Sequence, residues 1–169
     1  MLQLGDILPT VELPLLGGGA ESVGTNRSHS QVLVLAHPRP CDGCFAALAA
    51  LAGIADRVRV EKAAVMAVVT PGWSSTASLP VPAVVDDGTL RSHLGPDGEP
   101  VIAVVDRFGQ LFARAEAGPE HRFPHHDEVL ATLLNIAISC PECGVPDVPC
   151  SSTLPEPGTL SGGMRIGQT

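Results

Sequence analysis

Residues 31–56, with the sequence QVLVLAHPRPCDGCFAALAALAGIAD, contain the pattern that decides the fold of this 169-residue chain. Residues 31–36 form a continuous apolar run rich in β-branched side chains, which is typical of a strand covered on both faces in a parallel sheet. Pro38 and Pro40 follow, and proline prevents a helix from continuing and keeps the residue before it extended. We therefore expect a buried central strand followed by a turn.

A helix is expected directly after this turn. From Phe45 onward, apolar residues recur at spacings of three and four, which places them on one face of a helix that ends near Asp56. Cys41 consequently stands at the amino terminus of this helix, and Cys44 follows three positions later. A strand, a cysteine pair and a helix form the first part of a βαβ unit.

The flanking segments complete an α/β pattern. Residues 62–70 read as a second buried strand, which returns parallel to the first by a right-handed crossover. Residues 83–85 form a very short apolar run, and residues 89–94 hold about one turn of helix. Residues 100–114 contain two β-rich runs around a glycine turn, which predicts a hairpin. A last amphipathic helix is expected, with Asp127 as its cap.

Composition limits the classes of partner. Acidic residues outnumber basic ones by 18 to 10, the net charge is −8, and the basic residues are scattered, so we expect no nucleic-acid partner. The chain shows neither a basic leader with a cleavage site nor about 20 uninterrupted apolar residues. The expectation is a soluble, cytoplasmic protein without a membrane partner, and both monomer and homodimer remain open.

The length and the 44% hydrophobic content suit a single core. Residues 1–139 hold all the periodic patterns and are expected to form that domain. Residues 140–169 are rich in cysteine, proline and glycine, a composition that buries little surface, so we expect an extension whose last 20 or so residues are flexible.

Cys41 and Cys44 carry the chemistry that the sequence predicts. In a reducing cytosol, cysteines in Cys-x-x-Cys pairs are better suited to redox chemistry or metal binding than to forming a structural disulfide. The thiolate is the nucleophile, and unpaired backbone N–H groups at a helix start stabilise an anion. Arg39 and His37 are candidates to tune the thiolate. Zinc binding by the pair and inert packing of two small apolar side chains remain the alternatives.

The order of these motifs resembles the thioredoxin-like redoxin superfamily. The resemblance is carried by Pro40-Cys-x-x-Cys44, by the later run PVIAVVDRFG at residues 100–109, and by the opening GDILP at residues 5–9, and it covers residues 4 to about 139. The opening is similar to that of the alkyl hydroperoxide reductase and thiol-specific antioxidant group, which includes the peroxiredoxins. The resemblance implies a three-layer α/β/α fold with a central mixed sheet of four or five strands and an amino-terminal β extension.

The resemblance also implies a role for Pro100. In that superfamily, the proline before the hairpin is a cis residue that faces the redox pair and orients the substrate, and Pro100 occupies the matching place.

Two enzymatic hypotheses follow. In the first, a thiol-disulfide oxidoreductase, Cys41 attacks a protein or small-molecule disulfide, Cys44 resolves the mixed disulfide, and a thiol donor supplies electrons. In the second, a peroxiredoxin-like peroxidase reduces hydroperoxides and Cys44 attacks first. The chain departs from the peroxiredoxin loop Pro-x-x-x-Thr/Ser-x-x-Cys, because His37 stands at the proline and Cys41 at the Thr/Ser position.

The carboxy-terminal cysteines leave three hypotheses open. Cys140, Cys143 and Cys150 could hold a structural zinc with His125 or His126, form a second redox site, or have no role. The zinc hypothesis corresponds to a third functional class, a non-enzymatic metal-bound scaffold. The two enzymatic hypotheses require no cofactor.

Overall fold

The computed structural model describes residues 1–26, 28–73 and 78–139. Residues Met1–Ala137 form one compact unit. A mixed five-stranded sheet in the order β5-β4-β3-β6-β7 lies at its centre, and β1 and β2 form a separate antiparallel pair. The strands are β1 (Val11–Pro14), β2 (Ala20–Val23), β3 (Ser30–Leu35), β4 (Ala63–Val69), β5 (Ala83–Val85), β6 (Val101–Val105) and β7 (Leu111–Glu116). The helices are α1 (Asp42–Ala52), α2 (Ala55–Val60), α3 (Thr89–Leu94) and α4 (His126–Ala137).

The pairing of the strands confirms the predicted topology. β3 and β4 are parallel and are joined through α1 and α2, which is the expected βαβ unit. β6 and β7 form the expected hairpin, and β6 runs antiparallel to β3. The pair β1–β2 is the expected amino-terminal β extension.

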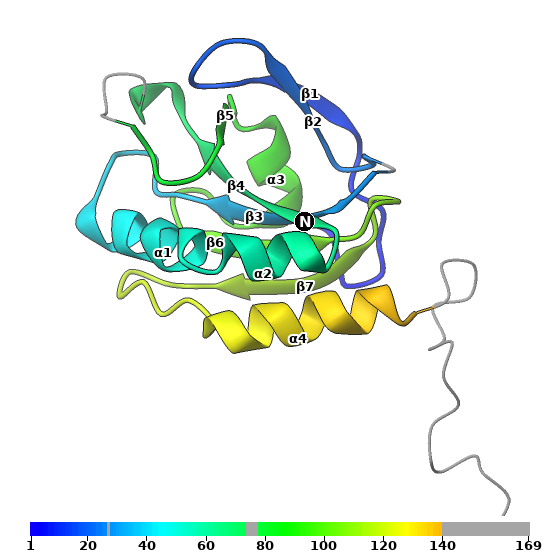
Figure 1. Cartoon of the computed structure of the whole chain (residues 1–169). Helices are drawn as coiled ribbons and strands as arrows, with labels where there is room; N and C mark the ends of the chain where they lie inside the picture. The colour runs from blue at the N-terminus through cyan, green and yellow to red at the C-terminus, as the bar shows by residue number, and fades with distance from the viewer. Residues whose placement is uncertain (27, 74–77, 140–169) are drawn as a thin grey trace, which may run out of the picture. The chain divides into compact units, whose positions relative to one another are not determined.

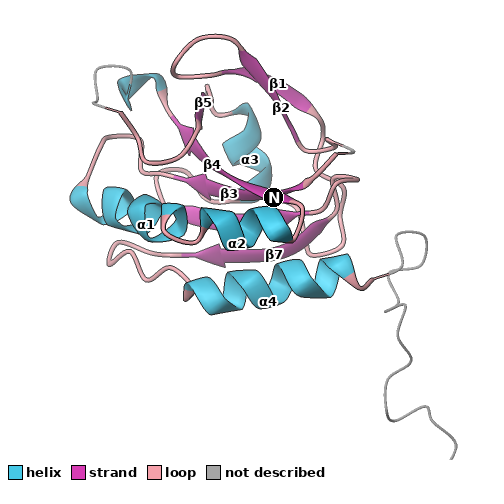
Figure 2. Cartoon of the chain, viewed as in Figure 1, coloured by secondary structure: helices cyan, strands magenta, loops and turns pink. Residues whose placement is uncertain are grey.

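The fold has three layers, and a hydrophobic core lies on each side of the central sheet. α1, α2 and α4 cover one face of the sheet, and α3 lies with β1 and β2 on the other (Figure 1). Because side chains alternate along a strand, Val32 and Val34 of β3 enter the first core, while Leu33 and Leu35 enter the second. Figure 2 shows the sheet between its two covers, so the predicted three-layer fold is confirmed.

Two boundaries differ from the predictions. The helix expected to reach Asp56 ends at Ala52, because glycine propagates a helix poorly and Gly53 serves as the cap, with its N–H bonded to the Ala49 carbonyl at 3.1 Å. Asp127 is not the cap of α4. His125 precedes the helix and its Nδ1 accepts the N–H of Asp127 at 3.4 Å, so the cap position belongs to the histidine.

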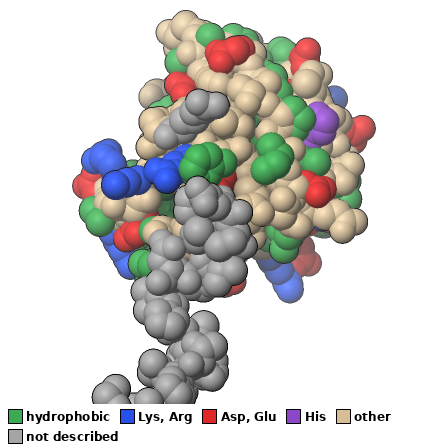
Figure 3. Space-filling model, turned by 90° about the vertical axis from the view of Figure 1, so that its right-hand side faces the viewer, with side chains coloured by type: hydrophobic (Ala, Val, Ile, Leu, Met, Phe, Trp, Pro, Cys, Tyr) green, Lys and Arg blue, Asp and Glu red, His purple; other side chains and the backbone are tan. Residues whose placement is uncertain are grey.

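Charges of both signs occur on the face of the molecule seen in Figure 3. Basic and acidic side chains are interspersed there. Among the described residues, every helix is too short or too polar to cross a membrane.

Candidate functional site

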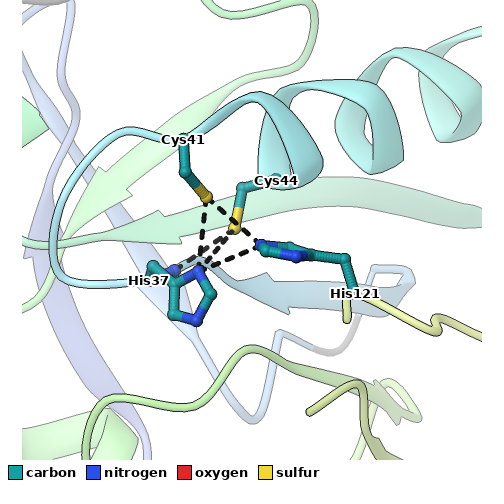
Figure 4. A group of neighbouring side chains, drawn as sticks. All are labelled: His37, Cys41, Cys44 and His121. Carbon is teal, nitrogen blue, oxygen red and sulfur yellow. Dashed lines mark hydrogen bonds between the residues drawn. The ribbon is translucent and has the colours of Figure 1, made fainter. Parts of the chain in front are cut away.

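Two thiols and two imidazoles meet at the start of α1. The side chains of His37, Cys41, Cys44 and His121 point toward one another (Figure 4), and their four ligand atoms all lie within 4.8 Å of each other. Cys41 Sγ is 3.3 Å from His37 Nδ1 and 3.2 Å from His121 Nε2. The two nitrogens are 3.0 Å apart, and Cys44 Sγ is 3.8 Å from His37 Nδ1.

Strand register brings the two halves of this cluster to one edge of the sheet. Leu35, the last residue of β3, pairs with Val101, and Val101 pairs with Glu116, the last residue of β7. The loops that follow β3 and β7 therefore leave from neighbouring positions. The first loop carries His37 into α1, and the second carries His121 toward α4.

The two cysteines occupy different environments. Cys41 is the residue that caps α1, its backbone is extended (φ −150°, ψ 151°), and its side chain is partly exposed. Cys44 lies inside the first turn and has no exposed surface. Burial raises the pKa of the Cys44 thiol to about 12, although the backbone N–H of His37, which donates to its sulfur at 3.4 Å, acts in the opposite direction. The partly exposed Cys41 is accordingly the sulfur that a reactant can reach.

His121 was absent from the sequence-based predictions. It reaches the cluster from a loop, with φ of 55°, a left-handed conformation that is uncommon outside glycine. A side chain at Gly43 would collide with its ring, because a Cβ atom there would lie 2.5 Å from the nearest ring atom. The glycine between the cysteines therefore leaves room for this histidine. Nothing near His121 in the sequence signals the contact, which spans 80 positions from Cys41.

The loop that carries His37 is held by the segment after β4. The buried Trp73 donates its indole N–H to the His37 carbonyl at 2.8 Å, and the Thr70 hydroxyl donates to the Pro38 carbonyl at 2.6 Å. These bonds fix the backbone from which the His37 ring projects. The sequence left Trp73 without a role, and its structural role is to anchor this loop.

A buried arginine that the sequence analysis did not single out acts on Cys44. Arg39 is exposed, and within the described residues no hydrogen bond or ion pair joins it to Cys41 or Cys44. Arg91 of α3 is buried, donates to the carbonyls of Ala36 and Glu99, and attracts the ionised form of Cys44 electrostatically.

The expectation of a cis bond at Pro100 is wrong. The described residues contain no cis peptide bond, so Glu99–Pro100 is trans. Trans is the ordinary state of X-Pro bonds, and here the Pro100 carbonyl accepts the N–H of Ala117 at 2.9 Å beside the β6–β7 ladder. Pro100 still precedes Val101 at the edge of the sheet where His37 lies.

Within residues 1–26, 28–73 and 78–139, two groups of side chains have the composition of a metal site. The first is the cluster of His37, Cys41, Cys44 and His121, and the second is the partly exposed trio His125, His126 and Asp127 at the start of α4. The other predicted metal or redox residues, Cys140, Cys143 and Cys150, lie outside the described residues.

Comparisons with known proteins identify the fold. No family model matches the chain, and a search of curated proteins finds no match. The chain is similar to the solved structure of peroxidoxin BcpB from Mycobacterium tuberculosis (TM-score 0.67, 20% identity, covering 80% of this chain and 99% of that one). It is similar to AhpC from the same organism (TM-score 0.65, 18% identity, covering 90% of this chain and 98% of that one). It is also similar to the exposed lipoprotein thioredoxin of Streptococcus pneumoniae (TM-score 0.61, 23% identity, covering 75% of this chain and 98% of that one). At these identities the likeness establishes the fold, which is thioredoxin-like as the sequence predicted.

Proposed function

We propose that this chain, whose fold is thioredoxin-like, is a thiol-disulfide oxidoreductase in which Cys41 attacks and Cys44 resolves. One observation carries the proposal. The partly exposed Cys41 caps α1, and the fully buried Cys44 lies three positions later with its sulfur within 4.8 Å of Cys41 Sγ. An accessible sulfur beside a protected one is the arrangement that two-step disulfide exchange requires.

The reaction balances as two successive displacements. Cys41 thiolate attacks one sulfur of a substrate disulfide, the Cys41–substrate bond forms, and the substrate S–S bond breaks to release one thiol after protonation. Cys44 then attacks the Cys41 sulfur, which forms the Cys41–Cys44 disulfide and releases the second substrate thiol. The substrate gains two electrons, and a dithiol donor later returns them to the pair.

Nearby imidazoles supply the proton transfers. His121 Nε2 and His37 Nδ1 are within 3.3 Å of Cys41 Sγ, close enough to accept the thiol proton and return it to a leaving thiolate. Cys44 attacks only when deprotonated, and burial holds its pKa at about 12. His37 Nδ1, at 3.8 Å from Cys44 Sγ, is positioned to accept that proton as the second bond forms. The helix start stabilises an anion at the same point.

A peroxidase that begins at Cys44 is less consistent with this geometry. A peroxidatic thiol has to meet the hydroperoxide as a thiolate, whereas Cys44 has no exposed surface and its desolvation disfavours the ionised form. The similarity to peroxidoxin BcpB and AhpC keeps hydroperoxides as a second substrate class to test. Disulfides are the substrate class that an exposed Cys41 favours.

The order of attack is tested with insulin reduction by the full chain in the presence of a dithiol donor. Cys41→Ser should reduce the rate to the uncatalysed level, because the accessible thiolate of the pair is lost. Cys44→Ser should accumulate a mixed disulfide at Cys41, detected by intact mass after mixing with the substrate. As a matched control, the triple variant Cys140→Ser/Cys143→Ser/Cys150→Ser should keep the rate of the wild type.

The peroxidase alternative predicts the reverse dependence. Rapid oxidation by hydrogen peroxide that survives in Cys41→Ser and disappears in Cys44→Ser would contradict the proposed function. Stopped-flow measurement of each single variant separates the two outcomes.

A further inference from the structure

We propose that His37, Cys41, Cys44 and His121 form a Zn²⁺ site, and that the reduced chain binds one ion there. The two thiolates and the imidazole nitrogens His37 Nδ1 and His121 Nε2 are the ligands. The proposal goes beyond disulfide exchange, because binding an ion requires neither a substrate nor turnover.

The spacing of the four atoms matches the coordination shell of zinc. Zinc–sulfur bonds of about 2.3 Å and zinc–nitrogen bonds of about 2.0–2.1 Å give a tetrahedron with edges of roughly 3.3–3.8 Å. The recorded edges are 3.0 Å between the two nitrogens, 3.2 and 3.3 Å from Cys41 Sγ to the nitrogens, and 3.8 Å from Cys44 Sγ to His37 Nδ1. Along these four edges, shifts of a few tenths of an ångström give the tetrahedral values, and the two remaining edges, from Cys44 Sγ to Cys41 Sγ and to His121 Nε2, are at most 4.8 Å.

Hydrogen bonds alone leave part of this cluster unsatisfied. Cys41 Sγ, His37 Nδ1 and His121 Nε2 form a triangle with edges of 3.0–3.3 Å. A ring nitrogen that carries a proton has no lone pair to accept with, and one that lacks a proton cannot donate. Hydrogens therefore bridge at most two of the three edges at a time. A cation at the centre interacts with every lone pair at once.

The set of ligand atoms selects the ion. Two thiolates and two imidazoles in a tetrahedral arrangement form the Cys₂His₂ set of structural zinc sites. Binding releases the two thiol protons, so one Zn²⁺ replaces two H⁺ without any change of oxidation state. All four positions come from the protein, which leaves no open coordination position for a substrate.

Surrounding groups support the ligands in the way that outer-shell partners do in zinc sites. The His37 backbone N–H donates to Cys44 Sγ, and the Trp73 indole fixes the His37 carbonyl. Gly43 leaves the space that the His121 ring occupies. The site thereby ties the start of α1 to the loop before α4.

Zinc and disulfide are mutually exclusive at this site. The two sulfurs bond either to the ion or to each other, so oxidation of the pair removes both thiolate ligands. Bound Zn²⁺ conversely occupies the Cys41 sulfur that attacks the substrate. Zinc would therefore inhibit disulfide reduction, and oxidation would release zinc.

The test uses the reduced full chain carrying Cys140→Ser/Cys143→Ser/Cys150→Ser, so that the cluster supplies the only cysteines. Zn²⁺ affinity is measured by competition with a chromophoric chelator, and Co²⁺ is added separately to detect the absorption of a tetrahedral thiolate site. We expect one ion per chain. His121→Ala in this background should weaken binding by at least about tenfold, as should Gly43→Ala, which displaces the His121 ring.

Three controls separate binding from general damage. Gly17→Ala, where an added Cβ meets nothing within 4 Å, should bind Zn²⁺ like its parent, and so should His126→Ala in the second histidine group. The triple-serine chain with Cys41 and Cys44 oxidised to a disulfide should lose the ion without any substitution in the cluster, which covers the case in which His121→Ala fails to fold. Far-ultraviolet circular dichroism checks each variant.

Absence of Zn²⁺ binding in the triple-serine chain, or equal affinity in its His121→Ala form, would overturn the proposal. Insulin reduction is measured separately in the presence of a chelator, so loss of the zinc site and loss of disulfide exchange are distinguished.

Discussion

Cys41 and Cys44 show how strongly the position within one helical turn changes the exposure of a thiol. Cys41 caps α1 and touches two imidazoles from a partly exposed position, whereas Cys44 faces the first core and has no exposed surface. A buried thiol keeps its proton because the low dielectric disfavours the charged form. The pair therefore divides into an accessible sulfur and a protected one.

The raised pKa of Cys44 predicts a pH dependence of stability. The unfolded chain loses this proton near pH 9, while the folded chain holds it to about pH 12. Between these values the unfolded state binds fewer protons, so the free energy of unfolding falls as pH rises. In urea denaturation under reducing conditions above pH 9, we expect the wild type to lose stability more steeply than Cys44→Ala, by up to about 1.4 kcal/mol per pH unit.

Cys41→Ala is the matched control for that experiment. Because it leaves the buried thiol and its desolvation in place, its stability should still fall with pH more steeply than that of Cys44→Ala, although the smaller contribution of Cys41 to the raised pKa of Cys44 is lost. Identical slopes for Cys44→Ala and the wild type would show that Cys44 ionises equally in both states.

At the scale of elements, α3 depends on one buried carboxylate. Asp86 accepts the backbone N–H groups of Leu90 and Arg91, both at 3.0 Å, and these are donors that the short helix cannot satisfy itself. Its negative charge also attracts the Arg91 guanidinium, which in turn bonds to the Ala36 carbonyl just before His37. Asp86 thus links the start of α3 to the edge of the sheet that carries the site.

Asp86→Ala should lower the free energy of unfolding by about 2 kcal/mol, because two buried N–H groups lose a charged acceptor. Chemical denaturation monitored by circular dichroism measures the change. The neighbouring Asp87→Ala is the control: Asp87 accepts from Thr89 at the exposed surface, so its loss should be smaller. Equal losses of stability in the two variants would contradict the prediction that the buried Asp86 contributes more than the exposed Asp87.

At the scale of the molecule, the buried residues of both cores, in the part of the chain that the structure describes, lie within the first 133 residues. The first core extends to Leu133 of α4, and the second ends at Leu111 of β7. All helices and strands of the described residues fall within Met1–Ala137. The sheet, its two covers and the Cys41 cluster all belong to this unit.

A chain that ends at Ser139 should fold without residues 140–169. We expect its thermal midpoint, followed by circular dichroism, to lie within a few degrees of that of the full chain, because all described residues of both cores are kept. The near-ultraviolet signal of the buried Trp73 reports whether the loop around His37 stays packed. Loss of the cooperative transition would contradict the predicted domain boundary.

Most elements of the central fold are encoded locally, and the sequence predicted them, whereas α2 was not predicted as a separate helix and the β1–β2 pair was expected only from the family resemblance. An apolar run of strand length at residues 31–36, helical spacing after Cys44 and a glycine turn at residues 106–109 each act over a few positions. Their order along the chain led to the thioredoxin-like fold and placed Cys41 at a helix start. The break at Gly53 also had a local cause, but the apolar stripe continued across it.

The composition of the site was decided by tertiary structure. His121 joins Cys41 because Leu35, Val101 and Glu116 align across three strands, which brings together loops that are some 80 residues apart. The influence of Arg91 on Cys44 likewise depends on tertiary structure, because it is the packing of α3 against the sheet that lets Arg91 bond to the Ala36 carbonyl. Sequence periodicity records which face of an element is buried, whereas only strand order and register fix which distant side chains meet.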